Sequence, residues 1–383
     1  MNKLFPTQEV GSLAKPIWRI ESYTGESLSR DEINEAVHWG RTLRIENLDE
    51  LVKLLSERDF AGKRRALLEW SAKYAIRFFE TAGLDIFFDG EQWRSEMYEH
   101  VVRKTAGFKF LGYVKSFDYR YFNKAACIDK PKYTKPFYLD EFLFTKENTK
   151  GKMKVPITGA YTLVDWTFNE YYEKRLSGEI IDFKTRKFKA KEEFLFDLIK
   201  EVIRREIRKL VDAGAKGIQI DEPAATTNTT DEEMELFVEC FNETVKGFNC
   251  IFSLHNCYSN YEILAKHACE LRNCSQLSLE FANRDSRQAG TGNERTGYNA
   301  IGSFEEHSFQ GNYGLGVVDV HTDFVEPPEL VRDRILHVAR TIGDPSRICV
   351  SPDCGLRTRT WETSFQKLKN MVFGAELARK AAA

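Results

Sequence analysis

Short apolar runs that end in polar residues alternate along this chain with longer amphipathic stretches, and this alternation limits the possible folds most strongly. The runs lie at residues 8–12, 84–88, 155–159, 216–220, 250–254, 276–279, 313–318 and 347–350. Buried strands separated by helices are typical of α/β proteins with a parallel sheet. If one weak strand is allowed, the chain has about eight strand–helix units, and this number favours a (β/α)8 barrel over an open sheet.

Local signals predict where several helices begin and end. Helical patterns cover roughly residues 31–56 and 60–82, and a third covers residues 194–212 before Ala213-Gly214 stops it. Thr230-Asp231-Glu232-Glu233 has the pattern of a capping box, and Pro327-Pro328 suits the first turn of a helix. These signals place helices between the predicted strands.

One stretch, residues 106–154, does not fit the alternation because it mixes aromatic and charged residues with turn signals. The 383 residues could form two domains, but single barrels with insertions also reach this length. We therefore expect one barrel domain over residues 1–383 with an inserted, β-rich excursion at about 106–154. It would lie near the C-terminal mouth of the barrel, although a solvated surface decoration is the alternative.

Charge and hydropathy restrict the partners. The formal net charge of −2 gives no basic field for nucleic acid, and no run of roughly 18 apolar residues is present that could span a bilayer. The first residues lack the apolar segment of a signal peptide, so we expect a cytoplasmic protein whose eight cysteines are thiols. Small molecules are the expected partners, and the oligomeric state stays open.

The polar residues at the strand ends contain a candidate metal site. In barrel enzymes the chemistry lies where the strands finish. Residues at these ends are Ser12, Glu91, Asp221, His255, Cys257, Glu280, Asp319, His321, Asp353 and Cys354. His255 and Cys257 are two positions apart and would share one face of an extended strand. Together with Glu280 and Cys354 they would make a tetrahedral set that suits zinc, whereas a buried thiol beside a hydrogen-bonded histidine is the alternative.

Several short motifs carry a resemblance to a known family. They are Gly11-Ser12, Gly90-Glu91, Ile220-Asp221-Glu222-Pro223-Ala224, His255-Asn256-Cys257-Tyr258-Ser259, Glu280, Asp319-Val320-His321 and Pro352-Asp353-Cys354-Gly355-Leu356-Arg357-Thr358-Arg359. In this order they resemble the motif series of the cobalamin-independent methionine synthase family. The chain is similar to the catalytic half of the long two-barrel enzymes, and the resemblance implies a short, single-barrel member.

The resemblance implies a zinc-dependent transfer of a methyl group to the thiol of homocysteine. His255, Cys257, Glu280 and Cys354 match the zinc ligands of the family, and Gly11, Ser12, Glu91 and Asp221 match residues that hold the amino acid. A Gly-Ser turn can receive a carboxylate, while two acids can pair with an ammonium group. The alternatives are a helix-capping role for Asp221 and an ion pair of Glu91 with Arg94.

The sequence restricts the identity of the methyl donor less than that of the methyl acceptor. Asp319 and His321, two positions apart on one predicted strand, could form an oriented acid pair near the nitrogen that loses the methyl group. His321 could instead be a hydrogen-bond partner of the site, and Trp166 could stack on a pterin ring or serve as a core anchor. The donor would be a methylfolate, a related pterin or a corrinoid protein. Alkyl transfer to another thiol and a purely structural zinc are the other possible functions.

Overall fold

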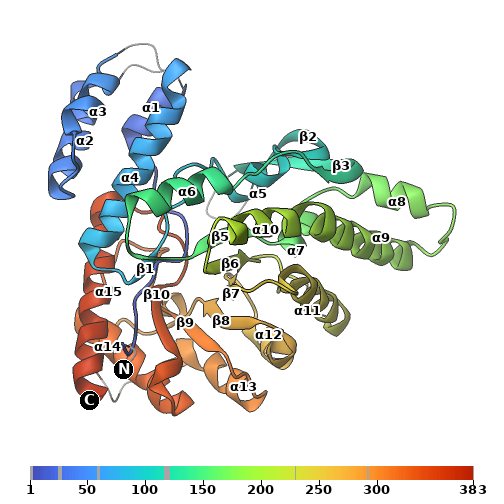
Figure 1. Cartoon of the computed structure of the whole chain (residues 1–383). Helices are drawn as coiled ribbons and strands as arrows, with labels where there is room; N and C mark the ends of the chain where they lie inside the picture. The colour runs from blue at the N-terminus through green and yellow to red at the C-terminus, as the bar shows by residue number, and fades with distance from the viewer. Residues whose placement is uncertain are drawn as a thin grey trace.

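Parallel strands form the core of the protein, which we describe from a computed structural model covering residues 3–24, 28–57, 61–115, 121–228, 230–290, 292 and 294–382. Six strands are hydrogen-bonded in the order β10-β9-β8-β7-β6-β5 (Figure 1). Their bounds are β5 (Val155–Thr158), β6 (Gly217–Asp221), β7 (Ile251–Asn256), β8 (Cys274–Leu279), β9 (Asn312–Val318) and β10 (Ile348–Pro352). Nearly all of their residues are buried, as expected for a parallel sheet covered by helices.

The first part of the chain closes this sheet into a ring. Thr7 pairs with Val350 of β10, and Gln8 pairs with Ile86 of β1 (Ile86–Phe87), both in parallel. β1 in turn pairs with β4 (Lys152–Met153), which leads directly into β5. The ring confirms the predicted (β/α)8 barrel. Its third strand begins at Lys152, inside the stretch that the sequence assigned to the insertion.

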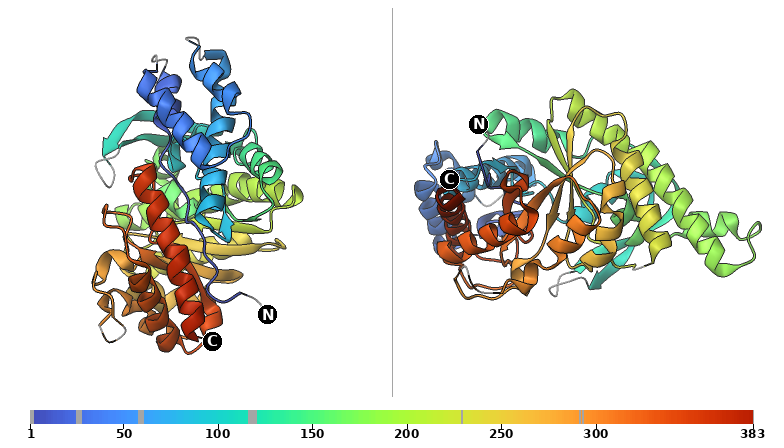
Figure 2. Two further views of the ribbon diagram at one scale, coloured as in Figure 1. Left: turned by 90° about the vertical axis from the view of Figure 1, so that its left-hand side faces the viewer. Right: turned by 90° about the horizontal axis from the view of Figure 1, so that it is seen from below.

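Helices surround the ring, as the view from below shows (Figure 2). They are α4 (Arg64–Ala82), α7 (Ala160–Asp165), α8 (Glu170–Leu176), α9 (Phe183–Leu198), the π-helical turn at Ile199–Ile203, α10 (Arg204–Asp212), α11 (Asp231–Val245), α12 (Tyr261–His267), α13 (Ala300–Glu306), α14 (Pro328–Ile342) and α15 (Trp361–Ala382). The predicted ends are confirmed: α10 stops before Gly214 at φ +99°, and α14 starts at Pro328. Within the described residues, no helix is both long and apolar enough to cross a membrane.

Three helices near the N-terminus, α1 (Ile17–Thr24), α2 (Arg30–Thr42) and α3 (Leu48–Leu55), form a separate group beside the barrel (Figure 1). The helical pattern predicted over roughly 31–56 is thus divided between α2 and α3. Arg44 and Asn47 adopt φ values of 53° and 56°, a left-handed conformation that interrupts a right-handed helix. Trp39 of α2 packs on Trp361 at a centroid distance of 5.4 Å and so joins the group to the last helix.

The inserted stretch contains a β-hairpin and a helix. β2 (Thr105–Lys115) and β3 (Tyr121–Tyr133) pair in antiparallel fashion, and α6 (Leu139–Asn148) follows; residues 116–120 lie outside the described residues. The backbone N–H of Cys127 donates to the carbonyl of Phe168 (2.8 Å), beyond the C-terminal end of β5. The hairpin therefore packs on the side of the barrel where β5 ends.

Candidate functional site

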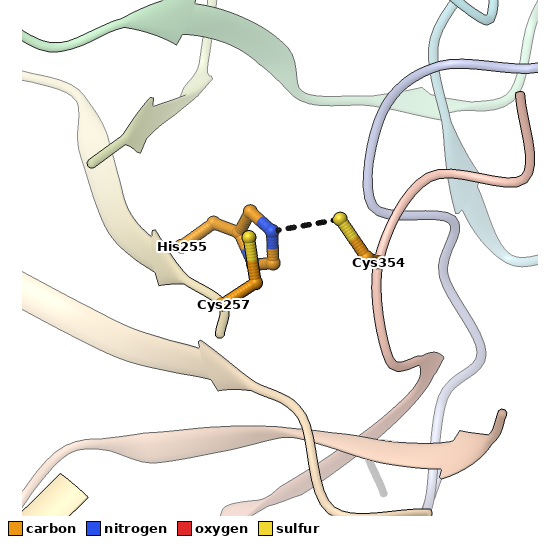
Figure 3. Close-up of side chains that lie close together, drawn as sticks. All are labelled: His255, Cys257 and Cys354. Carbon is orange, nitrogen blue, oxygen red and sulfur yellow. Dashed lines mark hydrogen bonds between the residues drawn. The ribbon is translucent and has the colours of Figure 1, made fainter. Parts of the chain in front are cut away.

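Three sulfur and nitrogen ligands meet at the C-terminal rim of the barrel. His255 lies in β7, Cys257 follows this strand directly, and Cys354 follows β10. One ligand atom from each residue lies within 4.8 Å of the others. The Nε2 atom of His255 is 3.6 Å from the Sγ atom of Cys354, and the Sγ atom of Cys257 lies beside both (Figure 3). The structure thus brings together three of the four predicted metal ligands.

The hydrogen bonds of this cluster direct its ligand atoms toward one point. The Nδ1 atom of His255 lies 3.0 Å from the carbonyl oxygen of Ser278, so an N–H at Nδ1 donates to it and Nε2 faces the Sγ atom of Cys354. A hydrogen bond from the thiol of Cys257, and then one from His255, lowers the pKa of Cys354 to about 5 despite its burial. A thiolate, a second thiol and an imidazole in a buried site are a donor set that fits zinc better than magnesium or calcium.

Glu280, the fourth predicted ligand, lies beside the cluster but outside this group of atoms. It follows β8 and is fully buried. Its Oε2 atom accepts the backbone N–H of Tyr258 (2.7 Å), and its Oε1 atom lies 3.1 Å from Nε2 of His321. The carboxylate therefore faces His321, while its negative charge still raises the pKa of Cys257, after the larger effects of the Cys354 hydrogen bond and burial.

A buried carboxylate joins the loops that carry Glu280 and Cys354. Asp353 Oδ1 accepts the backbone N–H groups of Phe281 and Ala282 (both 2.9 Å), and Oδ2 accepts that of Asn283 (2.7 Å). In the sequence, Asp353 was identified as a polar residue at the end of a strand, but no role was predicted for it. An acid directly before a candidate ligand at a strand end was the available signal, but its partners lie about 70 residues away in the sequence.

The predicted amino-acid residues Gly11, Ser12 and Glu91 lie close together. A Cβ atom on Gly11 would come within 3.1 Å of Glu91 Oε1, and one on Gly355 would come within 2.9 Å of the Ser12 nitrogen. Glu91 has φ +58°, a strained conformation that is common at functional sites. Its Oε1 atom also lies 3.4 Å from Nη1 of Arg94, so the ion pair considered as an alternative is present.

Asp221 ends β6 and is opposite His255 in the register of β6 and β7. Gln219 Nε2 donates to Asp221 Oδ1 (2.7 Å), and Lys154 Nζ donates to Gln219 Oε1 (2.5 Å), so a chain of buried polar groups orients the carboxylate. Burial raises the pKa of Asp221 to about 7. The following helix, α11, is capped by Thr230, and the helix-capping alternative for Asp221 is therefore wrong.

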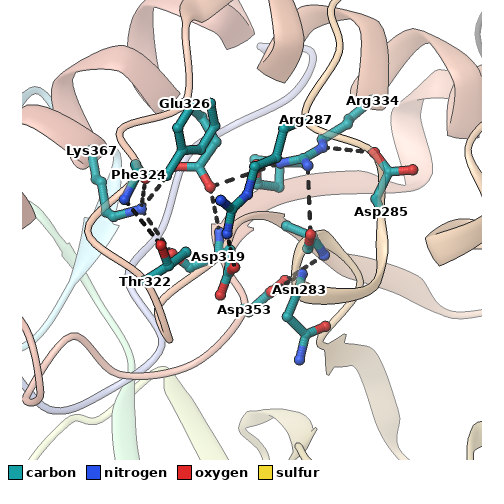
Figure 4. Close-up of polar contacts among 12 residues, drawn as sticks. Asn283, Asp285, Arg287, Asp319, Thr322, Phe324, Glu326, Arg334, Asp353 and Lys367 are labelled. Carbon is teal, nitrogen blue, oxygen red and sulfur yellow. Dashed lines mark hydrogen bonds and ion pairs between the residues drawn. The ribbon is translucent and has the colours of Figure 1, made fainter.

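Asp319 and His321 lie in the loop after β9 and not on the strand as predicted, because β9 ends at Val318. The Asp319 N–H donates to Glu326 Oε1 (2.8 Å) in place of a strand partner. Asp319 Oδ1 accepts the backbone N–H of His321 (2.8 Å), so the carboxylate bonds to the main chain and not to the ring. Lys367 Nζ donates to the Asp319 carbonyl (2.8 Å) and to Glu326 Oε2 (2.9 Å), which fixes the loop (Figure 4).

The imidazole of His321 lies between a phenol and a carboxylate. Tyr258 Oη is 3.0 Å from Nδ1, and Glu280 Oε1 is 3.1 Å from Nε2. A ring protonated at Nε2 satisfies both, since it accepts from the phenol and donates to the carboxylate. Tyr258 belongs to the motif at residues 255–259, but the sequence predicted no role for it. It adopts a φ of +56° directly after Cys257, and its side chain lies toward His321.

Trp166 ends α7 and packs against the inserted hairpin. Its ring stacks on Phe122 at a centroid distance of 5.2 Å, and Tyr98 lies 6.3 Å away. The indole is half-buried, so one part of its surface belongs to the aromatic contact with the hairpin and another part is accessible.

Comparisons with known proteins agree on one family. The family model described as "Cobalamin-independent synthase, Catalytic domain" matches residues 49–377. A methionine synthase of Thermococcus kodakarensis is 39% identical over 378 residues, covering 98% of this chain and 94% of the relative. A methionine synthase of Pyrococcus horikoshii is 36% identical with the same coverage.

Solved structures share the fold over the whole chain. A B12-independent methionine synthase from a Shewanella species, solved in complex with selenomethionine, has a TM-score of 0.73. Its sequence is 20% identical, and the match covers 99% of both chains. A methyltransferase from Methanosarcina mazei has a TM-score of 0.59 at 13% identity, covering 100% of this chain and 96% of that one.

Proposed function

Because the chain belongs to the cobalamin-independent methionine synthase family, we propose that it transfers a methyl group to the thiol of homocysteine and forms methionine. The observation that carries this proposal is the cluster of His255, Cys257 and Cys354 at the rim of a closed barrel, beside buried acids. Two relatives named methionine synthase cover nearly the whole chain, so the proposal concerns the complete barrel.

We propose zinc as the metal of this cluster. His255, Cys257 and Cys354 would hold it, with Glu280 as a fourth ligand after a rotation of its side chain away from His321. Zinc lowers the pKa of a thiol that coordinates it, so the sulfur of bound homocysteine would be a thiolate at neutral pH. The soft sulfur and nitrogen donors of the cluster support this choice of metal.

Four residues would hold the amino-acid part of homocysteine. The backbone N–H groups at Gly11 and Ser12 would receive its carboxylate, and the carboxylates of Glu91 and Asp221 would receive its ammonium group. The Lys154–Gln219–Asp221 chain supports the role of Asp221, since it keeps one carboxylate oxygen engaged and the other available. The guanidinium of Arg94 pairs with Glu91 and also with Glu141 (2.9 Å). The second ion pair fixes Arg94 and so helps to orient Glu91.

His321 and Asp319 would serve the methyl donor. Departure of a methyl group from a tertiary amine requires a proton on that nitrogen, and the His321 ring can hold and deliver one. Asp319 would act by fixing the backbone of His321, as its 2.8 Å hydrogen bond indicates. The accessible face of Trp166 would stack on a pterin, if the donor is a methylfolate or a related compound.

A donor screen tests the function. The purified protein, supplied with zinc and homocysteine, is incubated with mono- or polyglutamylated methylfolate, methylcobalamin or a methylcorrinoid protein, and methionine is measured. We expect methionine with at least one donor and loss of its formation in Cys354→Ser. Absence of methionine with every donor, together with methylation of another thiol, would instead support a related alkyltransferase.

A further inference from the structure

A cavity of about 510 Å³ lies near the amino-acid residues, and none of the residues assigned to the proposed reaction lines it. Its walls come from the segment after the first strand, from the region of α5 (Met97–Val102) and from α6. Its charged lining consists of Lys15, Arg19, Arg103, Lys104, Asp140 and Glu141. Basic groups thus outnumber acidic ones around the cavity.

The two acids compensate little of this positive charge. Both oxygens of Glu141 are engaged by Nε of Arg94, at 2.9 and 3.2 Å, and Arg94 does not line the cavity. Asp140 is exposed and lies 3.8 Å from Arg65, outside the cavity. Among the basic groups, Arg103 is paired closely with an acid, at 2.6 Å from Glu99. Lys15 and Lys104 therefore leave an excess of positive charge in the lining.

The ammonium group of Lys15 is compensated from a distance, by the carboxylates of Glu91 and Asp89. Among the described residues, none forms a hydrogen bond or ion pair with its ammonium group. Burial, together with the guanidinium groups of Arg19 and Arg357, lowers the pKa of Lys15 to about 7. Lys104 donates to the carbonyl of Phe137 (3.2 Å), and its ammonium group also lies 3.2 Å from Nε2 of His100. Cations held close together in a partly buried site are stabilised by a bound anion.

Apolar side chains form the rest of the wall. Trp93, Phe137, Leu68 and Ile20 line the cavity, and Ile20 is 45% exposed. An apolar wall beside cationic groups is typical of pockets for organic ligands, in which a few polar groups fix the orientation. A free inorganic ion would leave this wall uncovered.

We propose that this cavity binds a small organic anion, with a carboxylate or phosphate at Lys15 and Lys104 and an apolar body against Trp93 and Phe137. This inference goes beyond the proposed methyl transfer, since the binding needs neither the metal nor a thiol. The cavity lies near the amino-acid residues, because Glu141 of its lining and Glu91 are both paired with Arg94. A ligand here would therefore lie next to the homocysteine site and not in it.

Isothermal titration at about pH 6.5, where Lys15 is charged, tests the proposal. The probes are isophthalate for the carboxylate source, phenyl phosphate for the phosphate source, and benzyl alcohol as the neutral control. We expect saturable binding of one molecule per chain for at least one anion, and no such binding of benzyl alcohol. The stronger of the two anions identifies the source.

Variants locate the binding. Lys15→Met and Lys104→Met should each weaken it about tenfold or more, a typical loss for a partly buried charged hydrogen bond, whereas Lys53→Met on the exposed side of α3 should leave it unchanged. Two lysine variants are used so that the proposal can still be tested if one of them fails to fold. The proposal is wrong if neither anion binds, or if both folded variants bind as the wild type does. Binding without any methyl transfer would contradict only the proposed function.

Discussion

The Nε2 atom of His255 and the Sγ atom of Cys354 lie 3.6 Å apart, although 99 positions separate the two residues in the sequence. β7 and β10 are not neighbours, since β8 and β9 lie between them in the sheet. Only the curvature of a closed barrel brings their ends to one point. The cluster therefore depends on the closure of the fold as well as on the strand ends.

Metal analysis should find about one zinc per chain, as expected for a site with one set of ligands. Cys257→Ser and Cys354→Ser should each remove most of it, because an alcohol is a poor zinc ligand compared with a thiolate. Cys269→Ser, at an exposed thiol, is the matched control and should retain the metal. Full zinc content in both site variants would reject this set of ligands.

Asp221→Asn should weaken the binding of homocysteine about tenfold or more while leaving the zinc content unchanged, since a charge-assisted hydrogen bond to the ammonium group is lost. Titration with homocysteine measures the affinity. Asp49→Asn, at an exposed position on α3, serves as the control. Equal affinities of Asp221→Asn and the wild type would remove Asp221 from the amino-acid pocket.

His321→Asn should lower the rate of methyl transfer about a hundredfold, in the range of general acid catalysis, with a smaller effect on homocysteine affinity. Tyr258→Phe should cause a smaller loss of rate, because it removes only the phenol that bonds to Nδ1 of His321. Single-turnover rates and thiol binding are measured side by side. A wild-type rate in His321→Asn would refute the role of the imidazole.

Lys367→Met should destabilise the protein by about 3 kcal/mol, because the buried carboxylate of Glu326 would lose the closer of its two cationic partners, Lys367 and Arg334. The side chains of Lys367 and Glu326 are at most 1% exposed. Urea unfolding measures the change, and Lys369→Met, exposed on the same helix, should change the stability by less than about 0.5 kcal/mol. A loss as small in Lys367→Met as in this control would show that the network in Figure 4 contributes little.

Glu9→Gln should make the stability less dependent on pH. Burial raises the pKa of Glu9 from 4.5 to about 8, although Lys154 opposes this. Between these values the folded protein holds a proton that the unfolded chain releases, so the wild type loses stability as the pH rises. Relative to the wild type, the variant should gain on the order of 4 kcal/mol between about pH 5 and pH 8.5, as measured by urea unfolding. Parallel curves for the two proteins would contradict this.

The sequence predicted the barrel and the approach of His255, Cys257 and Cys354, because hydrophobic periodicity sets the strands and the strand ends share one rim. The orientation of Glu280 toward His321 and the bonds of Asp353 to the loop at 281–283 could not be predicted. Both depend on side-chain rotamers and on partners distant in the sequence. The position of Asp319 and His321 in the loop after β9 was missed for the same reason, since the distant Lys367 holds this loop through the Asp319 carbonyl.

The first strand joins the barrel through few bonds. The Gln8 N–H donates to Val350 (2.8 Å), the Val350 N–H to Pro6 (2.7 Å), the Glu9 N–H to Ile86 (3.2 Å) and the Ile86 N–H to Thr7 (3.0 Å). Strands with few ladder bonds open at a lower free energy than the rest of a fold. Gly11 and Ser12 follow this strand directly, whereas His255 lies in β7, which is paired with β6 and β8 on its two sides. Local opening can therefore release the amino-acid end of a bound product while its sulfur end stays in place.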